Sequence, residues 1–375
     1  MKETVHIFVL GSCFPAELGG PSNTIFQQAQ ALSDNNFNVK IFSTMAGITK
    51  EHKKTYSIVQ NKETLIDGVK ITFFKQYTSQ KISPLLLQEI KVLNRRYKII
   101  IHLNSVFFPL NLIICLFLFL YNVSFTIAPR GELIPQALSI KPIRKKILMP
   151  FVKKVLNKAS KIIITNKAEL EGIHVKKPSK IKVLPNYMKL PSALNLSKKK
   201  QLLFLGRINR IKCIDNLILA FSKSQCVQNH ELLIVGDGDS QYLDELKDIV
   251  KNNNISNKVT FQGAIFGDEK FKVYSESRLL ILPSKSENFG NVVIEALSQK
   301  TPVIACYNSP WKILEDKKCG FFTSNSIESL KKAMNSYYDL ETLDYEKMSE
   351  NAECVYIEKF SREKNIDLIC RTYDN

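Results

Sequence analysis

A chain of 375 residues, of which 45% are hydrophobic and 23% charged, is long enough for two domains of ordinary size, and this composition excludes a disordered or fibrous protein. The net charge of +18 comes from the first half: residues 1–200 hold 31 Lys and Arg against 10 Asp and Glu, whereas residues 201–375 hold 22 against 25. This asymmetry predicts a polyanionic partner, such as an anionic membrane surface, a nucleic acid or a phosphorylated substrate. A well-solvated Lys-rich surface would give the same count.

The first half alternates predicted strands and helices. Short apolar runs predict strands at 6–10, 39–43, 69–74, 99–103, 125–128, 161–165 and 181–184. Helical spacing of apolar residues predicts helices at 23–35, 85–96, 107–121 and 143–160, the last of them strongly basic around an apolar stripe. The segment Gly11 to Ser22 is predicted to be a loop, and Pro129 to Gly131 a turn.

Several features concern the compartment. The segment 106–121 is apolar, but its 16 residues are interrupted by Pro109 and Asn111 and fall short of the roughly 20 of a spanning helix, so a buried or membrane-facing helix is expected. No signal peptide is expected, because the first strand runs straight into Gly11. The eight cysteines form no C-x-x-C pair and are predicted to be reduced core residues of a cytosolic protein, and the five scattered histidines suggest no zinc site.

A linker is predicted at residues 188–200, and beyond it the alternation restarts. Strands are predicted at 202–205, 232–235, 259–261, 279–282 and 303–305, helices at 215–224, 241–252 and 291–299, and mainly helix from Ile327 onward. Two such series predict an α/β protein with two doubly wound domains, each a parallel sheet covered by helices. Ligands of such sheets bind beyond the carboxyl ends of the strands.

The stretch 283–297 is the strongest candidate for the chemistry. Glu287 lies in the loop after a predicted buried strand, and Glu295 lies in the early turns of the helix that Gly290 and Asn291 begin. The backbone N–H groups near Phe289 at this helix start, with the positive end of the helix dipole, suit a phosphate. A helix start that can bind a phosphate, with a carboxylate on each side of it, is suited to binding a nucleotide sugar. An ordinary strand–loop–helix unit with two solvated glutamates is the structural alternative.

The loop from Gly206 to Lys212 follows the first strand of the second half. Glycine allows a sharp bend, so that Arg207 and Lys212 can reach one point beyond the strand end and neutralise the charge of a departing diphosphate. Surface Arg and Lys are the alternative interpretation, but the position at a strand end favours a functional one.

Three further pieces are weaker. Asp237 and Asp239, in the run that begins at Gly236, could hold a divalent metal, but the glycines also make a tight turn, which we favour. The Gly19-Gly20 pair could let the backbone approach a phosphate. His102 is predicted to be a core residue, whereas Asn104 is the more exposed candidate at that strand end.

Taken in order, these pieces resemble a known family. They are Gly-Gly in the first loop, Gly-Arg-x-x-x-x-Lys after the linker, Val-Gly-Asp-Gly, Val-x-Phe-x-Gly, and Glu-x7-Glu carrying Phe-Gly. Together they resemble the retaining GT-B glycosyltransferases of the family 4 type. The segments 128–133, 165–169 and 184–186 resemble parts of the amino-terminal domain of bacterial members that build surface polysaccharides. The resemblance is strong over 201–310 and looser before 190.

The resemblance implies a role for each site residue. Arg207 and Lys212 would hold the diphosphate, Glu287 would contact the donor sugar and Glu295 would hydrogen-bond the ribose hydroxyls. The backbone of Phe289 and Gly290, with Asn291, would lie beside the sugar. Gly263 would lie at the base, Gly236 in the donor pocket, and Gly20 would approach the phosphates from the other domain. The chain departs from the family where His is frequent at Asn104 and His-Gly at Arg130-Gly131, so these two residues are only candidate acceptor or sugar contacts.

The resemblance therefore implies the GT-B fold, with two Rossmann-like domains facing a central cleft. Residues 1–190 would bind the acceptor and 201–355 a UDP- or GDP-linked sugar, while 356–375 would pack back on the first domain. The expected activity is a retaining, metal-independent transfer to a glycan or lipid-linked acceptor in bacterial polysaccharide biosynthesis, without a cofactor and without nucleic acid. The protein is expected in the cytoplasm, peripheral at the inner face of the cell membrane. A non-catalytic membrane-associated subunit and a nucleotide-sugar epimerase remain as alternatives.

Overall fold

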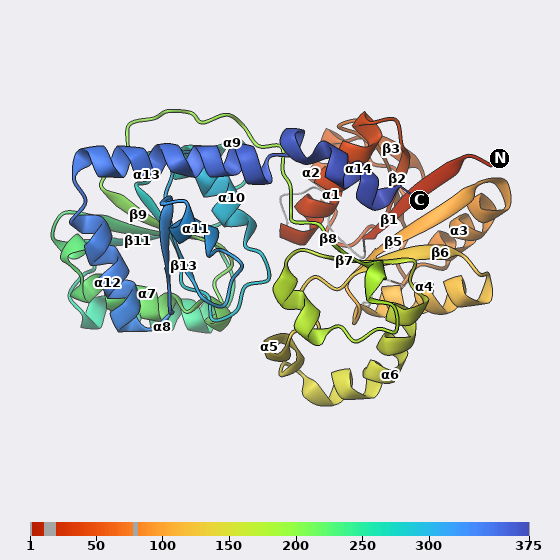
Figure 1. Cartoon of the computed structure of the whole chain (residues 1–375), viewed down its shortest axis with the longest axis horizontal. Coiled ribbons are helices and arrows are strands. Elements are labelled where there is room, and N and C mark those ends of the chain that lie inside the picture. Colours follow the sequence, from red (N-terminus) through yellow and green to blue (C-terminus); the bar gives the residue numbers. More distant parts are fainter. Residues whose placement is uncertain (1, 11–19, 78–81, 375) are drawn as a thin grey trace. The chain divides into compact units, whose positions relative to one another are not determined.

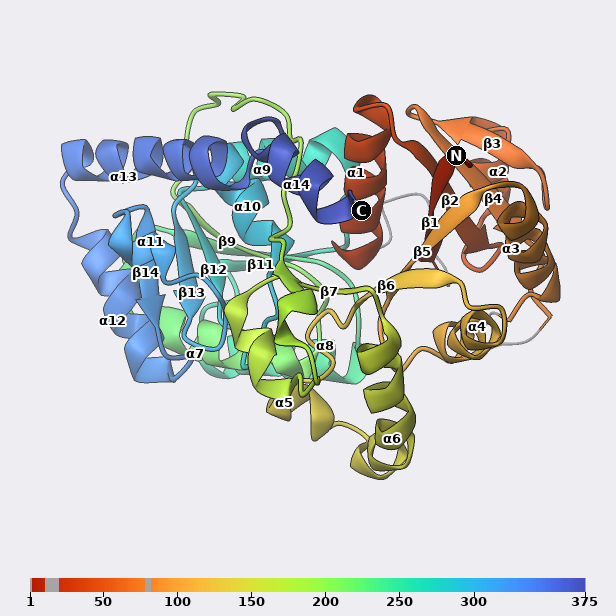
Figure 2. The ribbon, with the colours of Figure 1, turned by 45° about the vertical axis from the view of Figure 1, so that its right-hand side comes forward.

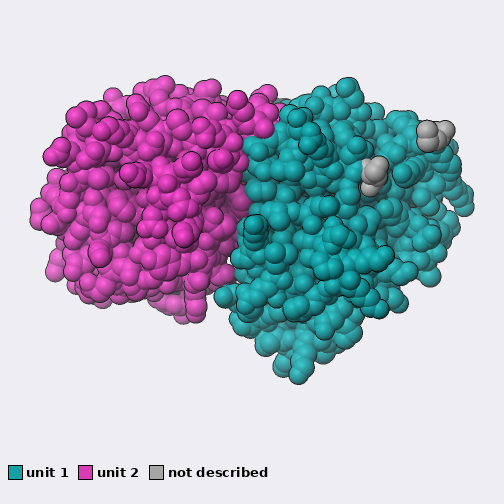
Figure 3. Space-filling model, in the orientation of Figure 1, with its two compact units in different colours: residues 1–187, 365–375 teal, residues 188–364 magenta. Residues whose placement is uncertain are grey.

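The computed structural model describes residues 2–10, 20–77 and 82–374 (Figure 1). The chain divides into two compact units, coloured separately in Figure 3. Unit 1 comprises Met1–Tyr187 and Asn365–Asn375, and unit 2 comprises Met188–Lys364. Each unit is built on a largely parallel sheet with helices packed on both faces, which confirms the predicted α/β class with two Rossmann-like domains.

Unit 1 carries an eight-stranded sheet in the order β3-β4-β2-β1-β5-β6-β7-β8, in which only β3 runs antiparallel to its neighbour. Its strands are β1 (Thr4–Leu10), β2 (Asn38–Thr44), β3 (Glu63–Ile66), β4 (Val69–Phe74), β5 (Lys98–Asn104), β6 (Ser124–Ala128), β7 (Lys161–Ile164) and β8 (Ile181–Val183). Its helices are α1 (Gly20–Asp34), α2 (Lys50–Thr55), α3 (Pro84–Arg96), α4 (Pro109–Leu120), α5 (Pro135–Leu138), α6 (Pro142–Lys158) and α14 (Ile366–Tyr373), with 3-10 turns η2 (Lys167–Gly172) and η3 (Pro178–Lys180).

Alternating side chains of the central strands enter opposite faces of the unit 1 sheet. Ile7 of β1 and Ile101 of β5 pack with α3, α4 and α6 on one face, whereas Phe8 packs with α1 and α14 on the other. This alternation is the period of two expected of a strand buried on both sides. The core on the Phe8 face of the sheet is called here the second core of unit 1. The carboxyl-terminal helix α14 completes it through Ile369 and Tyr373.

The structure corrects some predicted boundaries in unit 1. Helix α1 begins at Gly20 rather than at Asn23, so Gly20 lies at a helix start and not within a loop. Gly19 lies outside the described residues. The strand β3 was not predicted, because its four residues alternate exposed and buried side chains and contain only two aliphatic residues. It forms a hairpin with β4 through Asp67 and Gly68, whose φ angles of 44° and 78° fit a type I′ turn.

A pair of buried histidines lies in the second core of unit 1. His6 Nδ1 is 3.0 Å from His102 Nε2, and His102 Nδ1 is 2.7 Å from Thr126 Oγ1. The exposed fractions are 4% for His6 and 2% for His102, which confirms His102 as a core residue. Burial lowers the pKa of His6 from 6.5 to about 4, and it holds the pKa of His102 well below the usual value.

Because the two histidines are buried, we predict that the protein becomes less stable in mild acid. The unfolded chain protonates His6 near pH 6.5 but the folded chain only near pH 4, so the unfolded state binds more protons between these values. The free energy of unfolding should fall by up to about 3 kcal/mol as the pH drops through this window. Urea titrations at several pH values would measure it. In His6→Gln the slope should be shallower, whereas the exposed His174→Gln should match the parent; equal slopes for all three proteins would refute the assignment.

Unit 2 carries a six-stranded parallel sheet in the order β11-β10-β9-β12-β13-β14. Its strands are β9 (Gln201–Leu205), β10 (Glu231–Val235), β11 (Val259–Gln262), β12 (Leu279–Leu282), β13 (Val303–Cys306) and β14 (Gly320–Thr323). Its helices are α7 (Ile214–Lys223), α8 (Ser240–Asn252), α9 (Gly267–Glu276), α10 (Asn291–Ser298), α11 (Ile313–Asp316), α12 (Ile327–Tyr338) and α13 (Thr342–Val355). Shorter turns are η4 (Arg210–Lys212), η5 (Gln225–Gln228), η6 (Tyr356–Phe360) and η7 (Glu363–Asn365), of which Asn365 already clusters with unit 1.

This strand order places a topological switch point between β9 and β12. Numbered within the unit, the strands run 3-2-1-4-5-6, the order of the classical dinucleotide-binding fold. Leu202 and Phe204 pack with α7, α8 and α12 on one face, while Leu203 and Leu280 pack with α9, α10 and α13 on the other. The crossovers from β9 and β12 leave towards opposite faces, so the loops that follow these two strands flank a crevice where ligands bind.

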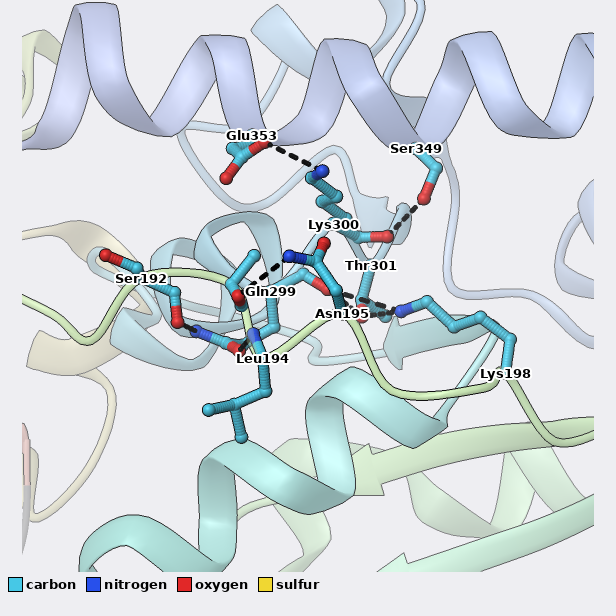
Figure 4. Close-up of polar contacts among 10 residues, drawn as sticks. Ser192, Leu194, Asn195, Lys198, Gln299, Lys300, Thr301, Ser349 and Glu353 are labelled. Carbon is cyan, nitrogen blue, oxygen red and sulfur yellow. Dashed lines mark hydrogen bonds and ion pairs between the residues drawn. The ribbon is translucent and has the colours of Figure 1, made fainter.

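The predicted linker 188–200 is extended, but it is not loose. Met188 is fully buried in unit 2, and Gln299 donates to the carbonyl of Pro191 at 3.1 Å. Figure 4 shows Lys198 reaching Thr301, whose Oγ1 accepts a hydrogen bond of 2.7 Å. Burial lowers the pKa of Lys198 to about 7. The segment is therefore part of unit 2, anchored through side chains that polar composition alone does not reveal.

Two further predictions concern the whole chain. Among the cysteines that the structure describes, five are buried, Cys370 is partly buried and Cys354 is exposed, so the prediction of core cysteines fails at Cys354. Cys354 is an exposed residue of α13. Within the described ranges, no helix has both the length and the apolar character needed to cross a membrane.

Candidate functional site

The loops after β9 and β12 lie together at the switch point of unit 2. The backbone N–H of Lys285 donates to the carbonyl of Ile211 at 2.8 Å, which joins the two loops directly. One loop carries Arg207 and Lys212, and the other carries Glu287. Three residues predicted from separate motifs are therefore on adjoining loops at the ligand-binding edge of one parallel sheet.

The loop after β9 is shaped by close contacts with the loop after β10. The N–H of Ile208 donates to the carbonyl of Asp237 at 2.9 Å, and the N–H of Asp239 donates back to Ile208 at 2.9 Å. A Cβ atom at Gly236 would lie 1.9 Å from the carbonyl oxygen of Gly206, so only glycine fits there. With the Ile208 side chain buried at 2% exposure, the backbone is fixed on both sides of the exposed Arg207.

Lys212 and Glu287 form the central contact of the site. Lys212 Nζ lies 2.5 Å from Glu287 Oε2, and the two side chains are 19% and 15% exposed. Lys212 ends the short turn η4, where the N–H of Lys212 donates to Asn209 at 3.0 Å. A lysine ammonium has three donors, so Lys212 can keep Glu287 and still donate to a phosphate oxygen. Arg207, in contrast, has no hydrogen-bond or ion-pair partner among the described residues, and its charge is open to an anion.

Glu287 is held in place by its own loop and by the loop after β13. Its backbone N–H donates to the carbonyl of Asn308 at 2.9 Å, and Ser284 Oγ lies 3.4 Å from Glu287 Oε2. Gly290 lies against the same side chain: a Cβ at Gly290 would meet Glu287 Cγ at 3.1 Å. The conformation of Gly290, with φ 80° and ψ 70°, is left-handed and favours glycine.

Helix α10 begins directly after Gly290, as predicted. Asn291 is its first residue, and the N–H of Val293 donates to the carbonyl of Gly290 at 2.9 Å. The side chain of Phe289 points into the core, where its ring centroid lies 5.3 Å from that of Trp311. Trp311 Nε1 also donates to the carbonyl of Phe289. The helix start is thereby anchored to the core through Phe289, while Gly290 and Asn291 are only partly buried.

Glu295 has a more buried setting than the sequence suggested. Its side chain is 6% exposed; Oε1 lies 2.8 Å from Lys270 Nζ, and Oε2 accepts from Tyr274 OH at 2.9 Å. Burial, followed by the charge of Glu295, raises the pKa of Tyr274 well above its usual value. Both partners come from α9, and neither was predicted, because no local pattern links this helix to α10. Ribose binding at Glu295 remains a prediction. It requires the ribose hydroxyls to donate to the carboxylate lone pairs that Lys270 and Tyr274 do not use.

The glycines and aspartates of unit 2 have structural roles in the loops. Asp239 Oδ1 accepts from the N–H of Tyr242 at 3.2 Å and caps α8, which agrees with the turn interpretation of this run. Gly263 follows β11, and a Cβ there would lie 3.5 Å from Asp237 Oδ1. Gly236 and Gly263 thus lie on neighbouring loops, while a donor base at Gly263 stays a prediction. The described residues contain no group of three or more His, Cys, Asp and Glu side chains suited to a metal ion.

In unit 1 the candidates Asn104 and Arg130 are in direct contact. Asn104 Oδ1 accepts from Arg130 Nε at 3.0 Å and from Nη2 at 2.9 Å. Asn186 and Gln28 provide further amide oxygens, each at 3.2 Å from the guanidinium. Burial lowers the pKa of Arg130, with the charge of Glu169 acting in the opposite direction. All the acceptors in these contacts are neutral amide oxygens, so no carboxylate in them offsets the charge of the guanidinium at the strand ends of unit 1.

Two carboxylates hold the loop that carries Arg130. Glu169 accepts from the N–H of Gly131 at 2.7 Å and from the N–H of Thr165 at 2.8 Å. Glu132 accepts from the N–H of Val106 at 2.7 Å and from Ser105 Oγ at 2.7 Å. Both lie in segments on which the family resemblance rests, but their positioning role could not be derived from a single sequence.

Two Rossmann-like units in one chain, with the switch-point site in the second, define the GT-B architecture of solved glycosyltransferase structures. The Anabaena protein HepE in complex with UDP and glucose superimposes with a TM-score of 0.75 at 17% identity, over 99% of each chain. Sucrose-phosphate synthase from Thermosynechococcus elongatus superimposes with a TM-score of 0.79 at 18% identity, over 99% of this chain and 98% of that one. At this identity the likeness establishes the fold alone.

Sequence similarity is concentrated in part of the chain. Residues 189–355 match the protein family described as glycosyl transferases group 1. An uncharacterized glycosyltransferase of Methanocaldococcus jannaschii is 37% identical over 106 residues, which is 28% of this chain and 27% of that protein. The alpha-monoglucosyldiacylglycerol synthase of Streptococcus pneumoniae is 33% identical over 138 residues, 36% of this chain and 31% of that protein. The chain thus spans less than a third of the length of these two relatives.

Proposed function

We propose that this chain is a retaining glycosyltransferase that moves a sugar from a nucleoside-diphosphate donor, and that unit 2 binds the donor. The observation that carries the proposal is the contact between Lys212 and Glu287 at the switch point, beside the unpartnered Arg207. It lies inside the segment 189–355 that matches the group 1 glycosyl transferases. Cation and carboxylate side by side suit a substrate with a diphosphate next to a polyhydroxyl sugar.

The proposed reaction is a substitution at the anomeric carbon. The acceptor hydroxyl attacks on the face from which the diphosphate leaves, the bond from carbon to the phosphate oxygen breaks, and the acceptor proton passes to that oxygen. Lys212 and Arg207 stabilise the negative charge that builds on the leaving group, in a role that a metal ion has in other transferases. Because both side chains come from a loop with a fixed backbone, little reorganisation is needed when the charge develops.

The carboxylates would act on the sugar portion of the donor. Glu287, held by Ser284 and Asn308, can accept hydrogen bonds from sugar hydroxyls while it stays paired with Lys212. Glu295 would take the ribose hydroxyls with the lone pairs that Lys270 and Tyr274 do not use. A UDP-linked sugar is the first donor to test, since HepE is described in complex with UDP and glucose; GDP is the second.

For the acceptor we propose a glycan or a lipid-linked glycan of bacterial polysaccharide biosynthesis, with the protein at the inner face of the cell membrane. The excess of basic residues in the first half supports an anionic surface as a partner. The name of the Streptococcus pneumoniae relative, a synthase of a glucosyl lipid, points in the same direction. Asn104 and Arg130 are the proposed contacts of unit 1 with the sugar or the acceptor.

Calorimetric titration with UDP and with GDP tests the donor site directly. We expect saturable binding of one of them and a rise in melting temperature that grows with ligand concentration, since ligands that bind only the folded state stabilise it by mass action. Lys212→Ala should weaken this binding. No binding of either nucleotide would support a non-catalytic subunit instead. Conversion of the donor sugar to an epimer in the absence of any acceptor would support an epimerase.

A further inference from the structure

The surface formed by α4 and α6 of unit 1, called here the α4–α6 surface, exposes large aliphatic side chains. Ile143 and Ile147 on α6 are 77% and 73% exposed. They are four residues apart, so they project from one face of the helix. Leu116 on α4 is 52% exposed as well. In Figures 1 and 2, α6 lies at the edge of unit 1. Exposed isoleucines of this size, close together, are unusual on a protein that meets only water.

An open groove of about 730 Å³ runs between the two helices. Leu112 and Ile113 of α4 and Ile143 and Ile147 of α6 line it, and Arg144 lies at the same groove. The α4 residues that line the groove are Pro109, Leu112 and Ile113, so this wall is aliphatic. The groove is therefore a place where apolar chains can leave water while a cation remains at the rim.

Lys141 and Arg144 line the groove, and further basic residues follow along α6 without acidic partners. Between Glu132 and Glu169 the sequence contains no Asp or Glu, but it contains nine Lys and Arg. Six of these are exposed and form no ion pair within the parts of the chain that the structure describes: Lys141, Arg144, Lys146, Lys153, Lys154 and Lys158. Unpaired cations next to exposed isoleucines combine two properties in one surface.

We propose that the α4–α6 surface docks on a lipid bilayer that contains anionic lipids. Ile143 and Ile147 would enter the boundary between head groups and acyl chains, and the surrounding Lys and Arg would contact lipid phosphates. Nucleic acid or an acidic protein would satisfy the cations but would leave the isoleucines and the aliphatic groove without a partner. A bilayer satisfies both, as amphipathic helices at membrane interfaces do. The inference deepens the proposed function, since it names the surface that would bring the enzyme to a membrane-linked acceptor.

Flotation of the full chain with vesicles tests the proposal. Vesicles of phosphatidylcholine alone are compared with vesicles that also contain phosphatidylglycerol. We expect binding only to the anionic vesicles and a decrease at high salt. Ile143→Asn with Ile147→Asn should reduce the partition coefficient at least about tenfold. Arg144→Gln with Lys146→Gln should reduce it about fivefold for each charge removed.

Matched controls separate this surface from general properties of the protein. Leu343→Asn, at a side chain that is 66% exposed on α13, and Lys53→Gln with Lys54→Gln, on the exposed helix α2, should bind vesicles like the parent. Equal melting temperatures show that each variant is folded. If the parent protein does not bind the anionic vesicles, the proposal is overturned. Undiminished binding of the isoleucine variant would also overturn it, because adsorption would then be electrostatic alone.

The same proteins distinguish this inference from the proposed function. Titration with UDP and GDP reports on unit 2 and does not depend on the isoleucines of unit 1. Vesicle binding without nucleotide binding would support the docking surface and refute the proposed transferase function. Nucleotide binding without vesicle binding would support the proposed function and refute the docking surface.

Discussion

Replacing Lys212 with alanine is expected to lower the rate of sugar transfer by about 10²- to 10³-fold, the effect typical of losing one preorganised group that stabilises a leaving anion. Of the two predicted leaving-group cations, Arg207 and Lys212, it is Lys212 that the structure holds against the candidate sugar-binding carboxylate Glu287, at 2.5 Å. Without the ammonium, the departing diphosphate would lose a charge partner in a partly buried site, where water compensates poorly. The loss should therefore appear in kcat as well as in kcat/KM.

The stability of the Lys212 variant provides the control. Both side chains are partly exposed, so the free energy of unfolding should fall by only about 1 kcal/mol. Lys199→Ala removes the comparable but more exposed pair with Glu276 in the same unit, and it should leave transfer unchanged. Steady-state kinetics and urea unfolding of the two variants measure both quantities. Unchanged turnover in Lys212→Ala, in a protein that binds nucleotide, would contradict the assignment.

Glu287→Gln allows the pair to be tested as a unit. If Lys212 and Glu287 act together on the donor, the double variant should be less impaired than the product of the two single effects, because each single variant already disrupts the shared arrangement. Independent effects would mean that Lys212 acts on the leaving group without help from the carboxylate.

Much of the fold could be predicted from the sequence because buried parallel strands are apolar runs of fixed length. The runs at Leu279–Leu282 and Val69–Phe74 match β12 and β4 residue for residue. Edge strands are harder, since one side faces water: in β14, Gly320–Thr323, only the glycine is fully buried, and the strand was not predicted. The predicted linker also had a polar composition, yet Lys198 is partly buried and donates a hydrogen bond to Thr301. In both cases the structure depends on contacts between segments that are distant in the sequence.

The candidate site shows the same division. Arg207, Lys212 and Glu287 could be placed at one edge of a sheet, because the carboxyl ends of parallel strands meet there. The sequence could not show that Lys212 contacts Glu287 while Arg207 does not, nor that Lys270 and Tyr274 enclose Glu295. These choices depend on side-chain geometry across 20 to 80 positions of chain, roughly, for which a single sequence has no local signal.

The close packing of Gly290 against Glu287 leads to the second large effect. In Gly290→Ala the new methyl group would lie 3.0 Å from Leu282 Cδ2 and 3.1 Å from Glu287 Cγ, so the side chains of Leu282 and Glu287 must give way by a few tenths of an ångström. We expect transfer to fall by about tenfold to a hundredfold, since small displacements of positioning groups have effects of this size. The free energy of unfolding should fall by about 1–3 kcal/mol, because alanine is also strained at a φ of 80°.

Gly267→Ala is the matched control for backbone strain. Gly267 has a φ of 59° in the same unit, but a Cβ there meets no atom within 4 Å. Alanine at this position should therefore lower stability by about 1 kcal/mol and leave the transfer rate unchanged. Comparison of kcat and unfolding midpoints for the two variants separates strain from displacement of Glu287. If both alanine variants lose activity to the same extent, the position of Glu287 does not control the reaction, and Lys212 and Arg207 would have to account for catalysis without it.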